Sequence, residues 1–231
     1  MGADAYIVEN YGGEHQLDAV IRLMEVDLSE PYNVFTYRFF VDKWPELSFL
    51  AFSSSDVLPN EPSKEELAAL KASKKFYARC SDNTWKRLVG GIVCKMEPSN
   101  KTGLMRGYIA MLAVDAEYRR HGIGRDLTRR AIDKMIEGGA EEITLETETS
   151  NTTSLAFYQR FGFIRERCML NYYLFAGDAY KLVLPLPPKD DECPVVEPAP
   201  TVAEPVVEHK EPVKQQQKKP RKSGGKKKGH R

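Results

Sequence analysis

The sequence predicts an α/β domain, a mixed β-sheet flanked by helices, followed by a disordered tail. Between residues 6 and 186, short apolar strand-like runs alternate with segments of helical periodicity. Beyond residue 186 the chain becomes rich in proline, acids and finally lysine, a composition that buries too little apolar surface to offset the cost of ordering. We therefore expect one domain over residues 1–186, long enough for a sizeable core, and a tail over 187–231.

The elements follow from apolar spacing and from turn residues. The first helix is clearest, because Leu17, Val20, Ile21, Met24 and Leu28 are three or four residues apart and Pro31 follows. The expected helices cover residues 17–28, 63–70, 123–136 and 153–161. The expected strands cover residues 6–8, 49–52, 88–96, 107–114, 142–148, 163–170 and 179–186.

Two segments depart from this alternation. Residues 53–86 read as a polar surface insertion that starts as a loop over 53–60, and Ser63 with Glu66 forms a capping box for a short helix. The other segment is rich in aromatic residues, for which packing in the core is the favoured interpretation over a pocket role. These residues are Phe35, Phe39, Phe40 and Trp44.

Net charge is distributed unevenly along the chain. The total of 34 basic and 33 acidic residues gives +1, but residues 210–231 alone carry +9, residues 189–209 carry −5 and residues 1–188 carry −3. The longest uninterrupted apolar run, residues 109–114, is far shorter than the roughly 20 residues of a membrane span. The four cysteines have no paired spacing, so reduced thiols and no metal site are expected.

The stretch from Val114 to Gly124 carries the strongest functional signal. A strand ends, and a helix begins on a glycine-containing loop flanked by Arg119 and Arg120. The first N–H groups of a helix lack internal acceptors and the helix dipole is positive there, so a diphosphate is the predicted ligand. A dinucleotide fingerprint would need glycine at Leu127, and no nucleotide P-loop motif is present. The Arg-x-x-Gly-x-Gly spacing favours an anion loop over an ordinary glycine turn.

This loop resembles the acyl-CoA pyrophosphate loop of the GNAT acetyltransferases. Other segments resemble the catalytic subunits of NatC-type N-terminal acetyltransferases, so that the likeness covers nearly all of residues 4–186. These segments are residues 29–32 (Ser-Glu-Pro-Tyr), 44–47 (Trp-Pro-Glu-Leu), 107–114, 145–148, 158–163 and 172–174. The resemblance implies the GNAT acyl-CoA N-acyltransferase fold, in which acetyl-CoA, the co-substrate, lies between two splayed parallel strands.

The resemblance also implies roles for individual residues. Free backbone groups around Leu112 and Val114 would pair with the pantetheine arm of acetyl-CoA, as a strand edge pairs with a peptide. Asn151 would hydrogen-bond the same arm, with simple helix capping as its alternative. The pyrophosphate would be cradled by Arg119, Arg120, Gly122, Ile123 and Gly124.

The reaction requires a base, because an α-amino group with a pKa of about 7.7–8.0 is largely protonated at neutral pH. Strand alternation places Glu146 and Glu148 on one face, and the residues alone do not choose between them. The resemblance favours Glu146 as the base. It also implies that Tyr158 protonates or stabilises the leaving thiolate, with ordinary helix packing as the alternative role.

Substrate choice is expected to depend on aromatic and acidic groups at the opening. Glu30 and Tyr32 would grip the peptide's amino terminus, and Tyr172 and Tyr173 would form the opposite lip, with only one of them facing the peptide. NatC-type substrates begin with Met followed by Leu, Ile, Phe or Trp. The family sequence Phe-Arg-Tyr-Tyr reads Leu-Asn-Tyr-Tyr over residues 170–173 here, a departure in the lip.

The resemblance implies partners as well: nascent polypeptide N-termini and the large auxiliary and small Sm-like subunits of a NatC complex, in the cytoplasm and near the ribosome. The basic tail is expected to contact ribosomal RNA, with nuclear import or plain solubilisation as alternatives. Two other functions remain open, a lysine or small-amine acetyltransferase on the same scaffold and an RNA-tethered adaptor with a vestigial GNAT fold.

Overall fold

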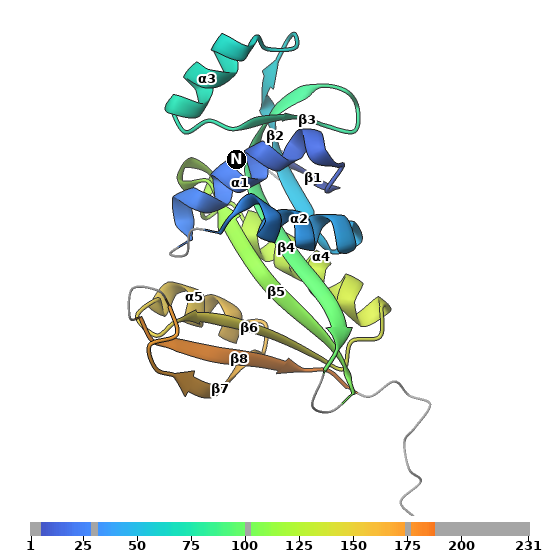
Figure 1. Cartoon of the computed structure of the whole chain (residues 1–231), viewed down its shortest axis with the longest axis vertical. Helices are drawn as coiled ribbons and strands as arrows, with labels where there is room; N and C mark the ends of the chain where they lie inside the picture. The colour runs from blue at the N-terminus through green and yellow to red at the C-terminus, as the bar shows by residue number, and fades with distance from the viewer. Residues whose placement is uncertain (1–5, 29–31, 100–102, 174–176, 188–231) are drawn as a thin grey trace, which may run out of the picture. The chain divides into compact units, whose positions relative to one another are not determined.

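The computed structural model describes residues 6–28, 32–99, 103–173 and 177–187 (Figure 1). The expectations for Glu30 and for residues 188–231 fall outside these ranges. None of the helices within them is both long enough and apolar enough to cross a membrane.

One mixed sheet forms the centre of the domain, as the sequence predicted. Its strand order is β1-β2-β4-β5-β6-β8-β7, with β3 also paired to β4. The β5–β6 pair is parallel and the other pairs are antiparallel. The strands are β1 (Tyr6–Asn10), β2 (Phe49–Leu58), β3 (Tyr77–Arg79), β4 (Trp85–Pro98), β5 (Met105–Val114), β6 (Glu142–Glu148), β7 (Ile164–Met169) and β8 (Ala179–Pro185).

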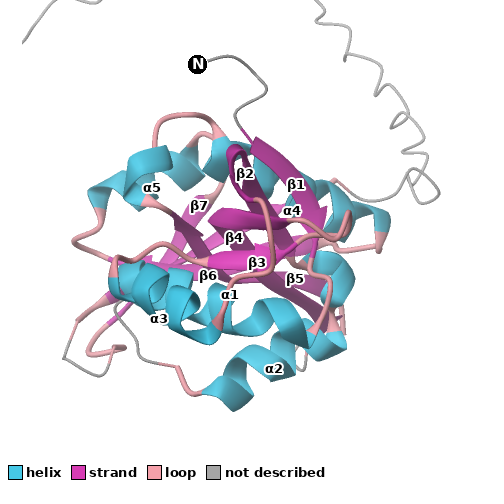
Figure 2. Cartoon of the chain, turned by 90° about the horizontal axis from the view of Figure 1, so that it is seen from above, coloured by secondary structure: helices cyan, strands magenta, loops and turns pink. Residues whose placement is uncertain are grey.

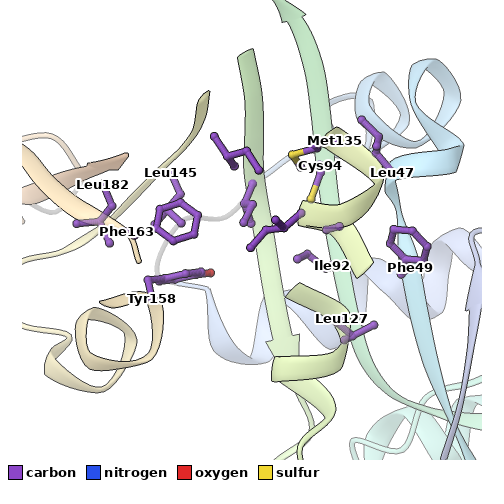
Figure 3. Close-up of a cluster of buried hydrophobic side chains, with 14 of the residues drawn as sticks. Leu47, Phe49, Ile92, Cys94, Leu127, Met135, Leu145, Tyr158, Phe163 and Leu182 are labelled. Carbon is purple, nitrogen blue, oxygen red and sulfur yellow. The ribbon is translucent and has the colours of Figure 1, made fainter. Parts of the chain in front are cut away.

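Helices cover both faces of this sheet (Figure 2). Apolar residues of α4 and α5 pack on one face, and those of α1 and α2 pack on the other, so the sheet separates two hydrophobic clusters. Figure 3 shows part of the first cluster. The helices are α1 (Glu14–Asp27), α2 (Val34–Lys43), α3 (Lys64–Ala72), α4 (Ile123–Glu137) and α5 (Thr152–Gln159), with two 3-10 turns, η1 (Pro45–Leu47) and η2 (Ala116–Tyr118).

The parallel pair β5–β6 separates after three residues. Its register runs from Arg106 opposite Glu142 to Tyr108 opposite Thr144 and then stops, although both strands continue. A β-bulge lies directly beyond this point. Val93 of β4 faces Met111, whereas Cys94 faces Ile109, which leaves Ala110 as the extra residue of β5. Because a bulge bends its strand, it turns the rest of β5 away from β6, and the predicted splay is present.

Helix α2 and the far half of β2 were not predicted. The α2 sequence, Val-Phe-Thr-Tyr-Arg-Phe-Phe-Val-Asp-Lys, is rich in β-branched and aromatic residues of modest helix propensity. The available signal was Asn33, whose side chain accepts a hydrogen bond from Thr36 N at 3.0 Å and caps the helix. Strand β2 extends to Leu58, so the loop expected over residues 53–60 was wrong.

The insertion over residues 53–86 is only partly a surface feature. Its capping box is confirmed, since the side chains and backbones of Ser63 and Glu66 exchange hydrogen bonds at the start of α3. However, Phe76, Ala78 and Cys80 are buried in the cluster beneath α1. The expectation of a polar surface segment was therefore wrong for its second half, which adds β3 to the sheet and apolar side chains to the core.

The aromatic segment divides between core and surface. Trp44 is buried and Phe40 packs against both clusters, as expected. Phe35 and Phe39 are 73% and 50% exposed, so the expectation of core packing was wrong for these two. They lie on the outward side of α2, whereas Tyr37 and Val41 point inward.

Gly90 of β4 permits the close approach of α4 to the sheet. A Cβ at this position would lie 2.6 Å from Cγ2 of Ile123 and 3.2 Å from Cδ1 of Leu127, both on α4. The first distance is shorter than a real carbon–carbon contact, so any side chain here would displace the helix that begins at the predicted anion loop.

We predict that Gly90→Ala lowers the free energy of unfolding by about 1–3 kcal/mol, because overpacking forces backbone shifts in a dense core. Urea unfolding of the wild type and the variant measures the difference. In a Gly90→Ala/Ile123→Ala double variant, the combined loss should be smaller than the sum of the single losses, since the clashing methyl is absent. Strict additivity would contradict the packing explanation.

Candidate functional site

The edge of β5 in the splay presents free backbone groups. The N–H of Asp115 donates to Val89 O of β4 at 2.9 Å. Because alternate residues of a strand face the same neighbour, Ala113 also faces β4, while Leu112 and Val114 face the splay, as predicted. The carbonyl oxygen of Val114 is already engaged, since it accepts a hydrogen bond from Nε of Arg119 at 3.1 Å. The edge near Leu112 can therefore accept an extended amide chain.

The loop between β5 and α4 has the form of an anion site. Within the described part of the chain, the backbone N–H groups of residues 120–125 donate to no protein acceptor, and the first bond of α4 runs from Asp126 N to Gly122 O at 3.0 Å. Arg120 and Gly122 have left-handed backbones, with φ of 68° and 87°. A Cβ at Gly122 would have no atom within 4 Å, so space lies open before these amides. The residues present fit a diphosphate.

The two loop arginines have different environments. The guanidinium of Arg119 forms an ion pair with Asp27 at the end of α1 and also donates to Val114 O. Arg120 is exposed at the loop tip. The structure thus places both at the loop, where the sequence predicted them, but Arg119 already has protein partners. Ile123 is buried against β4, so it contributes its backbone amide rather than its side chain.

The two candidate bases lie on the open part of β6. Both Glu146 and Glu148 are half-buried on the same face of the strand. The hydroxyl of Tyr108 donates to Oε2 of Glu146 at 2.7 Å across the start of the splay. Oε2 of Glu148 instead accepts from Ser150 Oγ at 3.2 Å, in the turn before α5. The hydrogen bond from Tyr108 therefore orients the carboxylate of Glu146 at the apex of the splay, where β5 and β6 stop pairing.

Tyr108 is a site residue that the sequence analysis did not single out. Burial, followed by the charge of Glu146 and the hydrogen bond to it, raises the pKa of the Tyr108 hydroxyl far above its usual range. The nitrogen of Lys95 lies 5.6 Å from the centre of the Tyr108 ring. A signal existed in the sequence: Tyr108 lies near the start of a strand that was predicted to run beside the strand of Glu146.

Tyr158 reaches the splay from α5. Its side chain is buried, and its ring packs edge-to-face on Phe157 and Phe163. Figure 3 shows the hydroxyl directed away from Phe163 and toward the β4–β5 half of the sheet. Burial raises the pKa of this hydroxyl well above its usual range, with smaller contributions from Cys94 and Tyr173. The packing role of Tyr158 is therefore present in the fold, and its role toward the thiolate stays a prediction.

Three tyrosines gather beside the two glutamates. Burial raises the pKa of the Tyr173 hydroxyl, and Tyr172, Tyr32, Glu148 and Glu146 raise it further. The rings of Tyr172 and Tyr173 meet edge-to-face with centroids 5.1 Å apart. Both residues lie in the turn after β7, not in a strand, so the alternation that would send only one of them toward the peptide does not apply.

Asn151 caps α5. Its side-chain oxygen accepts from Ser154 N at 3.0 Å, which is the capping role offered as the alternative to a ligand contact. Among the residues that the structure describes, no cluster of three or more His, Cys, Asp or Glu side chains could hold a metal ion. The arrangement therefore joins an anion loop, a free strand edge, a hydrogen-bonded carboxylate and a buried phenol along one opening in the sheet.

This arrangement agrees with comparisons to known proteins. Residues 33–163 match the model of the acetyltransferase (GNAT) family. The chain is 42% identical over 176 residues to N-alpha-acetyltransferase 30 of Saccharomyces cerevisiae, covering 76% of this chain and 85% of that protein. It is also 42% identical over 178 residues to N-alpha-acetyltransferase MAK3 of Arabidopsis thaliana, covering 77% of this chain and 76% of the relative.

A solved structure supports the same assignment. One chain in the crystal structure of the NatC complex bound to Gag peptide and CoA aligns with a TM-score of 0.64 and 38% sequence identity. The alignment covers 79% of this chain and 99% of that one. The match thus includes essentially the whole of that subunit and leaves about a fifth of this chain outside it.

Proposed function

Because the chain belongs to the GNAT acetyltransferase family, with N-alpha-acetyltransferase 30 among its relatives, we propose how its splayed sheet carries out N-terminal acetylation. It is a NatC-type catalytic subunit that transfers acetyl from acetyl-CoA to a protein α-amino group. The observation that carries the mechanism is the Tyr108–Glu146 hydrogen bond at the apex of the splay, together with the unpaired loop amides that follow the opposite end of β5.

Acetyl-CoA supplies a thioester with an activated acetyl group. The loop amides of residues 120–125 and the exposed Arg120 bind its diphosphate, and the edge at Leu112 pairs with an amide of its pantetheine arm. Asn151 lies at the start of α5, where its amide nitrogen is available to the arm while its oxygen caps the helix. These contacts orient the arm along β5 and bring the thioester end toward Tyr158.

Glu146 removes a proton from the incoming ammonium group, directly or through a water molecule. Tyr108 fixes one carboxylate oxygen by its hydrogen bond, so the other oxygen remains available to the amine. Glu148, nearer the mouth, attracts the positively charged amino terminus before the proton is removed. Holding the amine beside the thioester contributes further to the rate, because a correctly oriented pair no longer depends on a bimolecular encounter.

Tyr158 donates a proton or a hydrogen bond to the departing thiolate. Its raised pKa means that its hydroxyl stays protonated at and above pH 10, where an unperturbed tyrosine titrates. It can therefore act as a donor but not as a base throughout the working pH range. A loss of activity between neutral pH and pH 10 must therefore come from the titration of another group.

The peptide is held by the tyrosines at the mouth and by Glu30. Tyr32, Tyr172 and Tyr173 surround the two glutamates and offer aromatic surface beside an acidic entrance. This suits an initiator Met followed by Leu, Ile, Phe or Trp, since an aromatic wall favours apolar side chains and the carboxylates favour the free amino terminus.

The enzyme works with partner subunits on nascent chains. The aligned structure is a subunit of a complex, and Phe35 and Phe39 of α2 expose apolar surface of the kind that commonly marks protein contacts. The large auxiliary and small Sm-like subunits of NatC are the proposed partners. The +9 segment over residues 210–231 contacts ribosomal RNA, which places the enzyme in the cytoplasm at the ribosome, and nuclear import through this segment is the alternative.

We predict that Glu146→Gln and Tyr158→Phe each lower kcat by about 10²–10⁴-fold, the usual contribution of a general acid or base. Steady-state kinetics with a saturating peptide measures this. Glu148→Gln is the matched control and should raise the KM for the peptide more than it lowers kcat. Full activity in both Glu146→Gln and Tyr158→Phe would refute the catalytic assignment.

We predict that peptides beginning Met-Leu are acetylated faster than those beginning Met-Glu or Ser-Glu, and faster than a peptide whose only amine is a lysine side chain. The expected difference in kcat/KM is roughly 10–200-fold, the range that apolar pocket contacts supply. The assay compares the chain alone with the chain plus auxiliary subunits. Preferential turnover of the Ser-Glu or lysine peptide would contradict the NatC specificity.

We predict that deleting residues 210–231 reduces cosedimentation with ribosomes and leaves peptide acetylation unchanged. Binding should fall steeply as salt rises, because basic residues that meet phosphates release condensed counterions. A tail with its lysines and arginines replaced by glutamine is the control for length. Equal cosedimentation of the intact and truncated chains at low salt would rule out the RNA contact.

A further inference from the structure

Arg87 of β4 is a buried cation at the back of the anion loop. Only 5% of its side chain is exposed, yet three carboxylates surround its guanidinium. Nη2 contacts Asp115 at 2.7 Å, and Nη1 contacts Glu117 at 2.8 Å and Asp56 at 3.5 Å. The guanidinium also lies 5.3 Å from the centre of the Tyr118 ring.

Three of these groups belong to one short turn. Asp115, Glu117 and Tyr118 lie in or beside η2, the segment that joins β5 to the loop beginning at Arg119. Asp115 is fixed further, since its side chain accepts from Glu117 N at 3.0 Å and its backbone pairs with Val89. Arg87 therefore fastens the turn to the sheet immediately before the amides of residues 120–125.

The remaining groups come from the insertion. Between the pairs Phe52–Leu88 and Val57–Lys86, the bulged residues 53–56 of β2 oppose Arg87 alone. Within this bulge Asp56 contacts Arg87 and accepts a hydrogen bond from Tyr77 of β3. Ser53 accepts from the hydroxyl of Tyr118 at 3.1 Å. The insertion thus supplies the contacts of Arg87 and Tyr118 that η2 and its neighbours do not make.

From this geometry we propose that Arg87 is a positioning residue for acetyl-CoA and that the insertion over residues 53–86 serves to hold it. The cage of Arg87, Asp56, Asp115, Glu117 and Tyr118 fixes the angle at which the loop leaves β5. With the turn fixed, the loop amides are aligned for the diphosphate before it binds, so no ordering cost arises on binding. This inference rests on the proposed function of the loop.

The test separates diphosphate binding from general damage. Arg87→Lys keeps the charge but lacks the planar fork that reaches separate carboxylates. It should weaken CoA binding, measured by isothermal titration calorimetry, by roughly 2- to 30-fold. This is the range for mutations that change the energetics of a binding site without contacting its ligand. Turnover of S-acetylpantetheine, which lacks the diphosphate, should be unchanged, as should kcat with saturating acetyl-CoA.

Two further variants keep the proposal testable if Arg87→Lys fails to fold. Asp56→Asn, in the insertion and away from the loop, and Glu117→Gln should weaken CoA binding in the same direction. Asp82→Asn is the matched control, because it breaks the Lys86–Asp82 ion pair of the same insertion without touching η2, and it should bind CoA as the wild type does.

Unchanged CoA affinity in all three cage variants would overturn the proposal. So would an equal loss with S-acetylpantetheine, because the cage would then support the fold and not the loop. A wild-type chain that fails to bind CoA would instead overturn the proposed function of the loop, and the two failures are thereby distinguished.

Discussion

The end of hydrogen bonding between β5 and β6 is the constraint on which the rest of the site depends. Parallel strands that pair along their whole length would leave no backbone group between them for a ligand. The bulge at Ala110 prevents this by bending β5 where its pairing with β6 stops. It also reverses the side-chain alternation, so that Ile109 packs beneath α4 while Met111 and Ala113 pack beneath α1.

Opening a sheet in its centre exposes backbone groups that would otherwise be paired, which is costly when they are shielded from water. The structure satisfies one of them locally, because Arg119 donates to Val114 O at the end of β5. A side-chain hydrogen bond from Tyr108 to Glu146 bridges the two strands where their pairing ends. The two apolar clusters supply the remaining rigidity, since β5 and β6 are each held by antiparallel partners, β4 and β8.

The sequence was informative where chemistry and periodicity are local. Strand β6 has the predicted bounds and α4 ends one residue beyond them, because alternation and apolar spacing mark their faces directly. The loop at Gly122 was predicted from glycine and arginine spacing alone. Apart from α2, whose residues have modest helix propensity, the failures involve contacts between distant segments. The burial of Phe76, the exposure of Phe35 and the pairing of Tyr108 with Glu146 depend on which elements meet, and residue spacing does not encode this.

The same limit explains why the arginines near the loop have unlike roles. Spacing identifies Arg119 as a phosphate ligand, but in the fold its guanidinium is paired with Asp27 of α1. Arg87, which no motif marks, is held by Asp56, Asp115 and Glu117. Carboxylates already pair with both of these side chains, whereas Arg120 is exposed and the loop N–H groups donate to no acceptor among the described residues. Amides aligned by a fixed turn act on an anion only at short range, so the precision of the turn matters more than the number of positive charges around it.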